Sequence, residues 1–211
     1  MNIQSNPEKP VNEVISEKKR AIFESTLHLV REHGFHGTPM SLVAKTAGVA
    51  AGTIYHYFNG KDELICDLYH YNRRRLIQVV NDAVTEGGST RTKFYRICRS
   101  LFTFYSNHPN VLVFFEQFVN SPYREQVQSK NVDSRPLDEF LSDAVRQGVL
   151  KNYPTRIFMS TMMCTVVSAA KFSLSEEMRP TPEEFEQTID ILWDGFRNQE
   201  YSGSNPPTSE G

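Results

Sequence analysis

The sequence predicts an all-α protein of about nine helices, in which a small N-terminal helical domain precedes a larger one. Apolar residues recur three and four positions apart along most of the chain, which is the periodicity of amphipathic helices. Glycine, proline and Asn-Gly signals separate these periodic segments. No alternating strand pattern of any length occurs in the sequence. A hydrophobic content of 39% with 23% charged residues is ordinary for a globular protein.

The composition bounds the environment of the protein. Its three cysteines, Cys66, Cys98 and Cys164, are odd in number and widely spaced, so they form neither a disulfide framework nor a zinc-binding pattern. The N-terminus lacks an apolar signal core, and no run approaches the ~18 apolar residues of a membrane span. We therefore expect a cytoplasmic protein without a membrane partner.

The first three helices are marked by caps and breaks. Ser16 can cap a helix that runs to about residue 33, and Gly34 suits the positive-φ residue that ends it. Thr38 followed by Pro39 predicts a second helix, with a hydroxyl cap and proline at the first helical position. Gly48 interrupts this second helix, and a third covers roughly residues 51–58.

The larger domain is predicted at residues 61–198. It begins with a long helix from about Lys61 to Val84. The later helical segments are residues 91–106, the stretch between Pro109 and Pro122, residues 136–148, residues 154–174 and a last helix through Phe196. Residues 123–135 are polar and ambiguous, whereas Thr181-Pro182-Glu183-Glu184 is a capping box for the last helix. Residues 1–15 and 199–211 are polar and are predicted to be disordered tails.

Residues 39–58 have the pattern of a helix-turn-helix inside a domain at residues 16–60. Its two helices must pack closely, and small residues at the crossing permit this: Ala44, Ala47 and Gly48. The second helix of this motif, which is the third helix of the chain, begins with Ala50, Ala51, Gly52 and Thr53. This tip is slim enough to enter the major groove of duplex DNA. Thr53 is the only one of these with a polar side chain, so we expect sparse direct base reading, supplemented by thymine-methyl contacts or DNA shape.

Lys61 indicates a phosphate partner. A cation in the first turn of a helix opposes the helix dipole, which favours residues such as Asp62 and Glu63 there. The mismatch makes sense if a phosphate occupies that helix end, where backbone N–H groups and the ammonium would hold it. Further donors on the same DNA strand would come from nearby side chains: Thr38, Tyr55, His56 and Tyr57. The alternative is that the tyrosines pack inside the small domain, while His56 and Lys61 are solvated surface residues.

These residues resemble a known family. The runs G-F-x-x-T, A-x-x-A-G-V, G-T-I-Y-x-Y-F and K-D-E-L within residues 18–68 are similar to the N-terminal domain of the tetracycline-repressor (TetR) family of bacterial transcription regulators. The resemblance implies a three-helix helix-turn-helix DNA-binding domain plus a larger helical domain for effector binding and dimerisation. It also implies phosphate contacts from Thr38, Tyr55, Tyr57 and Lys61, and base reading by residues 50–53. Ala50 and Ala51 depart from the polar side chain that many members carry at these positions.

The resemblance further implies a homodimer on a palindromic operator, because two recognition helices must meet half-sites about 34–36 Å apart. The last two helices would then form a four-helix bundle across the two-fold axis. The candidate interface residues are small or aromatic: Ser160, Thr161, Cys164, Thr165, Ser168, Trp193 and Phe196. The alternative is that these side chains fill the core of a single copy.

An apolar or amphipathic small-molecule effector is expected between the helices of the rear domain. Methionine and aromatic side chains accommodate irregular ligands. The candidate ligand-binding residues are Phe102, Tyr105, Phe114, Phe115, Glu116, Phe118, Met159 and Met163. Core packing is the alternative for the apolar members of this set, and Glu116 could lie at the wet edge of its helix.

We therefore expect a ligand-released repressor without a cofactor, and not an enzyme. The sequence has no Glu-x-x-His pair for a di-iron bundle, no His-Glu-x-x-His zinc motif and no glycine-rich phosphate loop. Cys66 and His70 share a helix face but have no second pair to complete a metal site. Two alternatives stay open: a helical small-molecule carrier, and a family-like scaffold that has lost DNA binding.

Overall fold

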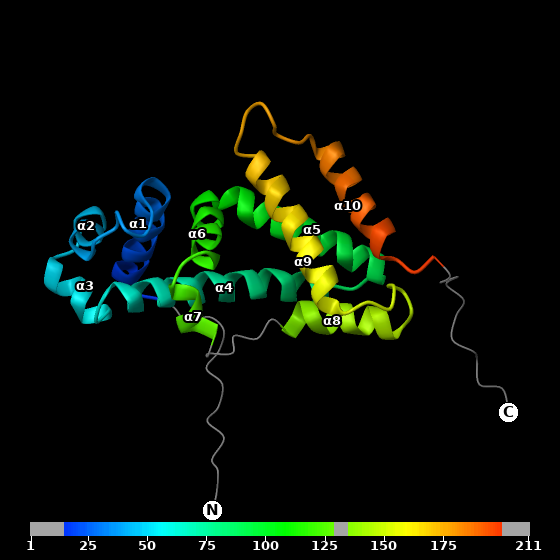
Figure 1. The fold of residues 1–211 in the computed structure, drawn as a ribbon, viewed down its shortest axis with the longest axis horizontal. Helices are drawn as coiled ribbons and strands as arrows, with labels where there is room; N and C mark the ends of the chain where they lie inside the picture. Colours follow the sequence, from blue (N-terminus) through cyan, green and yellow to red (C-terminus); the bar gives the residue numbers. More distant parts are fainter. Residues whose placement is uncertain (1–14, 129–134, 200–211) are drawn as a thin grey trace, which may run out of the picture. The chain divides into compact units, whose positions relative to one another are not determined.

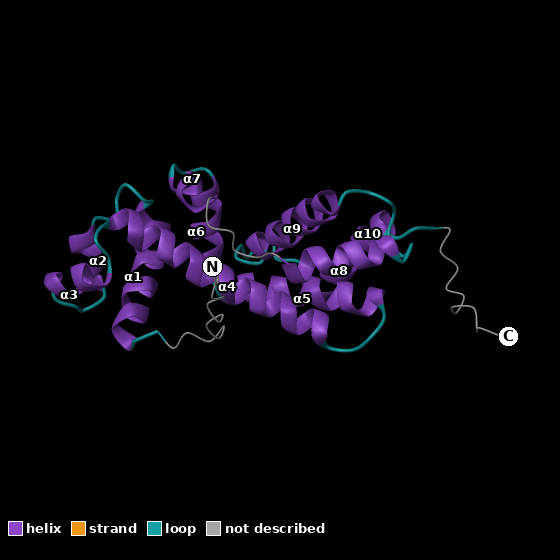
Figure 2. Ribbon diagram, turned by 90° about the horizontal axis from the view of Figure 1, so that it is seen from below, coloured by secondary structure: helices purple, strands orange, loops and turns teal. Residues whose placement is uncertain are grey.

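The computed structural model describes residues 15–128 and 135–199, and helices dominate this part of the chain (Figures 1 and 2). The ten helices are α1 (Glu17–His33), α2 (Met40–Thr46), α3 (Ala51–Tyr57), α4 (Lys61–Thr85), α5 (Thr90–Asn107), α6 (Pro109–Val119), α7 (Tyr123–Gln128), α8 (Arg135–Arg146), α9 (Thr155–Phe172) and α10 (Pro182–Phe196). The only β-type pairing among the described residues is one isolated antiparallel bridge between Leu150 and Arg197. The predicted all-α class is confirmed, and α7 forms inside the stretch that the sequence left ambiguous. The predicted tails lie outside the described residues, except for Ile15 and Gln199.

Local signals fix several helix ends as predicted. The Ser16 hydroxyl accepts a hydrogen bond from the Lys19 N–H at 3.3 Å and so caps α1. Gly34 ends α1 with φ of 65°, and Gly48 turns the chain between α2 and α3 with φ of 67°. At α10 the capping box is complete, because the Thr181 side chain and the Glu184 side chain each bond the other's backbone N–H.

The predicted cap of α2 is wrong. The helix begins at Met40, with Pro39 in the capping position and no side-chain hydrogen bond there. The Thr38 hydroxyl instead donates to the carbonyl of Gly34 at 2.8 Å and closes the turn that follows α1. A threonine next to a helix can bond backward as well as forward, and here the backward bond forms.

The chain divides into two compact units. Among the described residues, the first unit contains residues 15–75 and 110–128, and the second contains residues 76–109 and 135–199. The first unit therefore extends beyond the domain predicted at residues 16–60, since it includes the first part of α4, nearly all of α6, and α7.

The core of the first unit joins α1, α3 and α4 through aromatic contacts. The Phe23 ring lies 5.8 Å from Phe58 and 5.2 Å from Tyr71, measured between ring centroids. Lys19 covers this cluster: its ammonium lies 5.4 Å above the Phe58 ring and 3.3 Å from a carboxylate oxygen of Asp67. These contacts hold the end of α3 against α1 and α4.

The core of the second unit forms where α9 packs against α5, α8 and α10. Its largest members include Phe94, Phe158 and Trp193, all of them buried. On the surface of this unit, Arg99 of α5 forms a bidentate ion pair with Glu186 of α10, both distances being 2.6 Å. This hydrogen bond from Arg99 lowers the pKa of Glu186 below its usual value.

Candidate nucleic-acid interface

Helix α3 presents a slim exposed tip. Its first residues carry either a methyl group or no side chain, and Ala50, Ala51 and Gly52 are all exposed. Ile54 anchors the helix from the opposite face, because its side chain is fully buried. Thr53 is half-buried, so only part of it can reach a ligand. The residues predicted to read bases therefore lie at an accessible helix end, as a major-groove contact needs.

Aromatic and imidazole donors continue from this tip along α3. Tyr55 is 58% exposed and His56 is also exposed, whereas Tyr57 is half-buried. The Tyr57 and Ser16 hydroxyl oxygens lie 3.0 Å apart, and either can donate. Because Ser16 already accepts the Lys19 N–H, it can donate its own proton to Tyr57 and leave the phenol proton for an acceptor in solution. The sequence indicated Ser16 only as a helix cap, and nothing in the local pattern indicated that it meets Tyr57.

The first residue of α4 is a cation, Lys61, which follows these phenols closely in the sequence. The Lys61 ammonium donates to the backbone carbonyl of Phe35, which fixes the side chain next to the turn after α1. An ammonium carries three N–H groups, so this bond leaves donors for a phosphate. In the same helix start, Glu63 accepts hydrogen bonds from both the backbone and the side-chain nitrogen of Asn59 at 2.7 Å. Glu63 thus ties the first turn of α4 to the residue two positions before the helix, whereas Lys61 bonds the turn after α1.

Thr38 differs from the other predicted phosphate contacts. Its side chain is only 1% exposed, and its hydroxyl proton is directed to Gly34. The hydroxyl therefore holds the turn that carries Phe35, which favours a structural position for Thr38. Tyr55 and His56 remain as exposed donors, and Lys61 is half-buried with part of its side chain open to solvent.

The predicted effector residues belong to two different units. Phe114, Phe115, Glu116 and Phe118 belong to the first unit, whereas Phe102, Tyr105, Met159 and Met163 belong to the second. Most of them pack into the core of their own unit. Tyr69 stacks on Phe118 with a centroid distance of 4.2 Å, and Phe102 stacks on Phe185 at 4.0 Å. Met159 and Met163 are partly buried against the core of the second unit.

The predicted dimer residues also fall into two groups. The small side chains of α9 lie on an open face: Ser160, Thr161, Cys164 and Ser168 are exposed, and Thr165 is half-buried. Trp193 and Phe196 instead pack against Phe94, with ring centroids at 5.4 and 5.6 Å. For these two aromatics the structure supports the alternative of an intramolecular core. On the same helix Ile191, which the sequence analysis did not select, is 74% exposed.

The phenol, imidazole and ammonium groups of this region are hydrogen-bond donors, as an anionic ligand requires. Across residues 15–128 and 135–199, no three His, Cys, Asp or Glu side chains gather as a metal ion would need. None of the described helices combines the length and hydrophobicity needed to span a lipid bilayer.

Comparisons with known proteins match both parts of the chain. The family described as bacterial regulatory proteins, tetR family, matches residues 22–68, and the tetracyclin repressor-like C-terminal domain matches residues 90–196. An uncharacterized HTH-type transcriptional regulator of Haemophilus influenzae is 26% identical over 82% of this chain and 91% of its own length. The fatty acid metabolism regulator protein of Bacillus subtilis is 24% identical over 64% of this chain and 71% of its own length.

Solved structures share the fold. A TetR family transcription regulator from Marinobacter aquaeolei superposes with a TM-score of 0.79 at 24% identity, covering 86% of this chain and 96% of the other. The regulator FadR from Bacillus subtilis, solved in complex with stearoyl-CoA, has a TM-score of 0.69 at 17% identity, covering 83% and 98% of the two chains. The second domain match alone spans half of the sequence. The chain therefore belongs to the TetR family of bacterial transcription regulators and is a DNA-binding regulator of transcription.

Proposed function

We propose that this regulator is a homodimeric repressor, released from a palindromic operator by an apolar or amphipathic ligand. The observation that carries the DNA-binding site is the row of donors beside the exposed tip of α3. Tyr55, His56 and Lys61 offer a phenol, an imidazole and an ammonium within one short stretch of the chain. Phosphate contacts of this kind fix the position of a protein on DNA, and the tip then reads the groove.

The exposed face of α9 and α10 supports the dimer. Four small polar or thiol side chains of α9 are exposed, and Ile157 on the same helix is 45% exposed. Small side chains let two helices approach closely. Ile191 of α10 adds exposed apolar surface, and its burial against a second copy would be favourable. We propose that a second copy covers this face, so that two α3 helices reach successive half-sites.

A long-chain acyl compound is the ligand we favour. A Bacillus subtilis relative is named a fatty acid metabolism regulator protein, and the regulator FadR from Bacillus subtilis was solved in complex with stearoyl-CoA. Phe102, Met159 and Met163 are partly buried against the core of the second unit and would suit an acyl chain, because methionine adapts to irregular apolar shapes. Release requires that the ligand bind one conformation of the protein better than the DNA-bound one.

The test begins with selection of a binding site from a random pool of duplex DNA. The proposal predicts a two-fold symmetric sequence, bound more weakly as salt rises. Stearoyl-CoA should release the protein from that sequence, whereas free coenzyme A should not. Ile191→Asp should give a monomer in analytical ultracentrifugation and abolish tight operator binding. Val119→Asp is the matched control, since Val119 is 51% exposed but lies in the first unit.

Failure of these experiments has distinct meanings. If the selection enriches no DNA sequence and the purified protein carries a bound lipid, the results would favour the carrier alternative. A wild-type chain that sediments as a monomer would refute the operator-dimer mechanism. An asymmetric selected site would refute the palindrome.

A further inference from the structure

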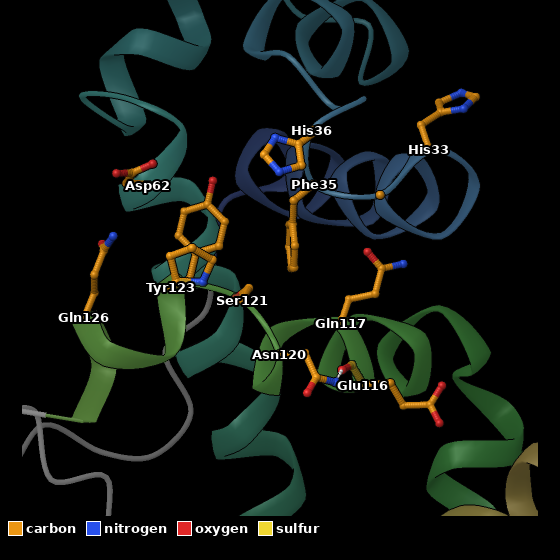
Figure 3. Close-up of a pocket in the computed structure, with 12 residues that line it drawn as sticks. His33, Phe35, His36, Asp62, Glu116, Gln117, Asn120, Ser121, Tyr123 and Gln126 are labelled. Atoms are coloured by element: carbon orange, nitrogen blue, oxygen red, sulfur yellow. Dashed lines mark hydrogen bonds between the residues drawn. The ribbon is translucent and has the colours of Figure 1, made fainter.

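The first unit contains a cleft of about 670 Å³, and Glu116 is the only residue of the predicted DNA, effector and dimer sets among its described lining residues (Figure 3). Its walls come from the 33–36 turn, the start of α4, the end of α6 and the start of α7. Its volume falls in the range of pockets that hold small molecules, roughly 300–1,000 Å³. All of the lining residues belong to the same compact unit.

The lining combines aromatic rings with negative charge. Phe35 and Tyr123 are half-buried and meet edge to face, with ring centroids 5.2 Å apart. Asp62 lies on the side of the cleft toward which the Tyr123 hydroxyl points, whereas the Glu116 carboxylate points away from the aromatic pair (Figure 3). Burial, and then the charge of Asp62, raises the pKa of Tyr123, so its phenol stays neutral near pH 7.

Among the residues that the structure describes, no lysine or arginine lines the cleft. The described lining therefore carries the carboxylates of Asp62 and Glu116, while the Lys61 ammonium bonds the backbone carbonyl of Phe35 and does not itself line the cleft. An anionic ligand such as an acyl-CoA would be repelled there. A positive charge would be attracted both by the carboxylate of Asp62 and by the faces of the two rings. The side-chain amides of Gln117 and Gln126 add groups that can bond a polar substituent.

The same turn that walls the cleft also holds the cation of the DNA-binding site. The Phe35 ring faces Tyr123 and Phe114, and the backbone carbonyl of Phe35 accepts the hydrogen bond from Lys61. A second tie joins this region to α6, where Gln117 donates to the carbonyl of Val30 at 3.0 Å. A ligand that wedges against the Phe35 ring would therefore shift the carbonyl that positions Lys61.

We propose that this cleft binds a small aromatic amine in its protonated form and that occupancy weakens operator binding through Phe35 and Lys61. The ammonium of the ligand pairs with Asp62, and its ring packs against Tyr123. The effect on DNA rests on the function proposed above, but the binding of the amine does not. The site is separate from the acyl ligand of the second unit and differs from it in charge.

The binding arm of the test uses tyramine as the probe and the full chain without DNA. Titration followed by amide chemical shifts should move signals of the 33–36 turn and of α7. Asp62→Asn should weaken tyramine binding about fivefold or more, because the salt link is lost. Glu24→Gln is the matched control, since it removes an exposed carboxylate of α1 that does not line the cleft. The anion 4-hydroxyphenylacetate should not compete with tyramine.

The regulatory arm measures operator affinity at constant ionic strength with and without saturating tyramine. We expect a loss of about fivefold in the wild type and no change in Lys61→Met, where the affected contact is absent. Equal binding of tyramine and 4-hydroxyphenylacetate, or unchanged binding by Asp62→Asn, would overturn the ligand assignment. Tyramine that binds without altering operator affinity would overturn the coupling. A chain that binds tyramine but selects no operator would refute the proposed function and the coupling while supporting the ligand site.

Discussion

Replacing Lys61 with methionine tests the proposed DNA contact most directly. The substitution keeps the apolar stem of the side chain and removes the ammonium that donates to Phe35. Each dimer would lose two ammonium–phosphate contacts, one per subunit. Since each phosphate contact contributes about 0.9 to the slope of log affinity against log salt, the slope should fall by about 1.8. A charged hydrogen bond is worth about 1.5 kcal/mol or more, so two of them correspond to a loss of roughly a hundredfold in affinity.

The assay is fluorescence anisotropy of a labelled operator between about 50 and 200 mM salt, the range over which such contacts weaken strongly. Lys151→Met is the matched control, because Lys151 also donates to a backbone carbonyl, that of Gly195, at 2.6 Å in the second unit. Both variants should lose about 1 kcal/mol of folding free energy from the lost bond. Only Lys61→Met should change the salt slope. An unchanged slope in Lys61→Met would mean that this lysine only ties the turn to α4, and the phosphate assignment would be wrong.

Three further perturbations follow from the described contacts. In a double-mutant cycle, Tyr57→Phe should weaken operator binding severalfold in the wild type and by less in a Ser16→Ala background. The reason is that Ser16 donates to the Tyr57 hydroxyl and so directs the phenol proton outward. Equal effects of Tyr57→Phe in both backgrounds would rule out this role of Ser16. Thr181→Ala removes half of the capping box of α10 and should lower the free energy of unfolding by about 1 kcal/mol in urea titrations, with no change of operator affinity in the folded protein. The pKa of Glu186 is lowered in the folded state, so its pairing with Arg99 stabilises the protein above the unfolded-state pKa and is lost as pH falls through the folded-state value. Because both side chains are about half exposed, Glu186→Gln should cost only about 0.5 kcal/mol near pH 7 and nothing at a pH well below the lowered pKa of Glu186, and a difference that persists there would contradict the ion-pair origin.

Signals carried by single residues or short runs predicted much of the fold. Ser16, Gly34 and Gly48 act at helix ends through their own side chain or their own φ, so the sequence alone identifies them. The capping box at Thr181 is a local motif of the same kind. The exposed tip of α3 also follows from a local pattern, since Ile54 is the apolar residue that must face inward.

Features that depend on several segments could not be predicted in this way. Periodicity indicates that Trp193 and Phe196 share a helix face, but not whether that face meets another helix of the same copy or a second copy. Thr38 had two possible backbone partners, and only the folded turn shows which one it bonds. The cleft beside Phe35 is assembled from four segments of the chain, so no local pattern indicates it.

The anchoring of α3 by Ile54 and Phe58, both away from its exposed tip, has a consequence for how operator preference can change. Ala50, Ala51 and Gly52 are exposed, so longer side chains fit there without repacking the protein, and they would change the favoured bases if these residues read bases as predicted. Lineages of such regulators can therefore drift toward new target genes by one or two codon changes, and engineers can follow the same route with a small library at these three sites.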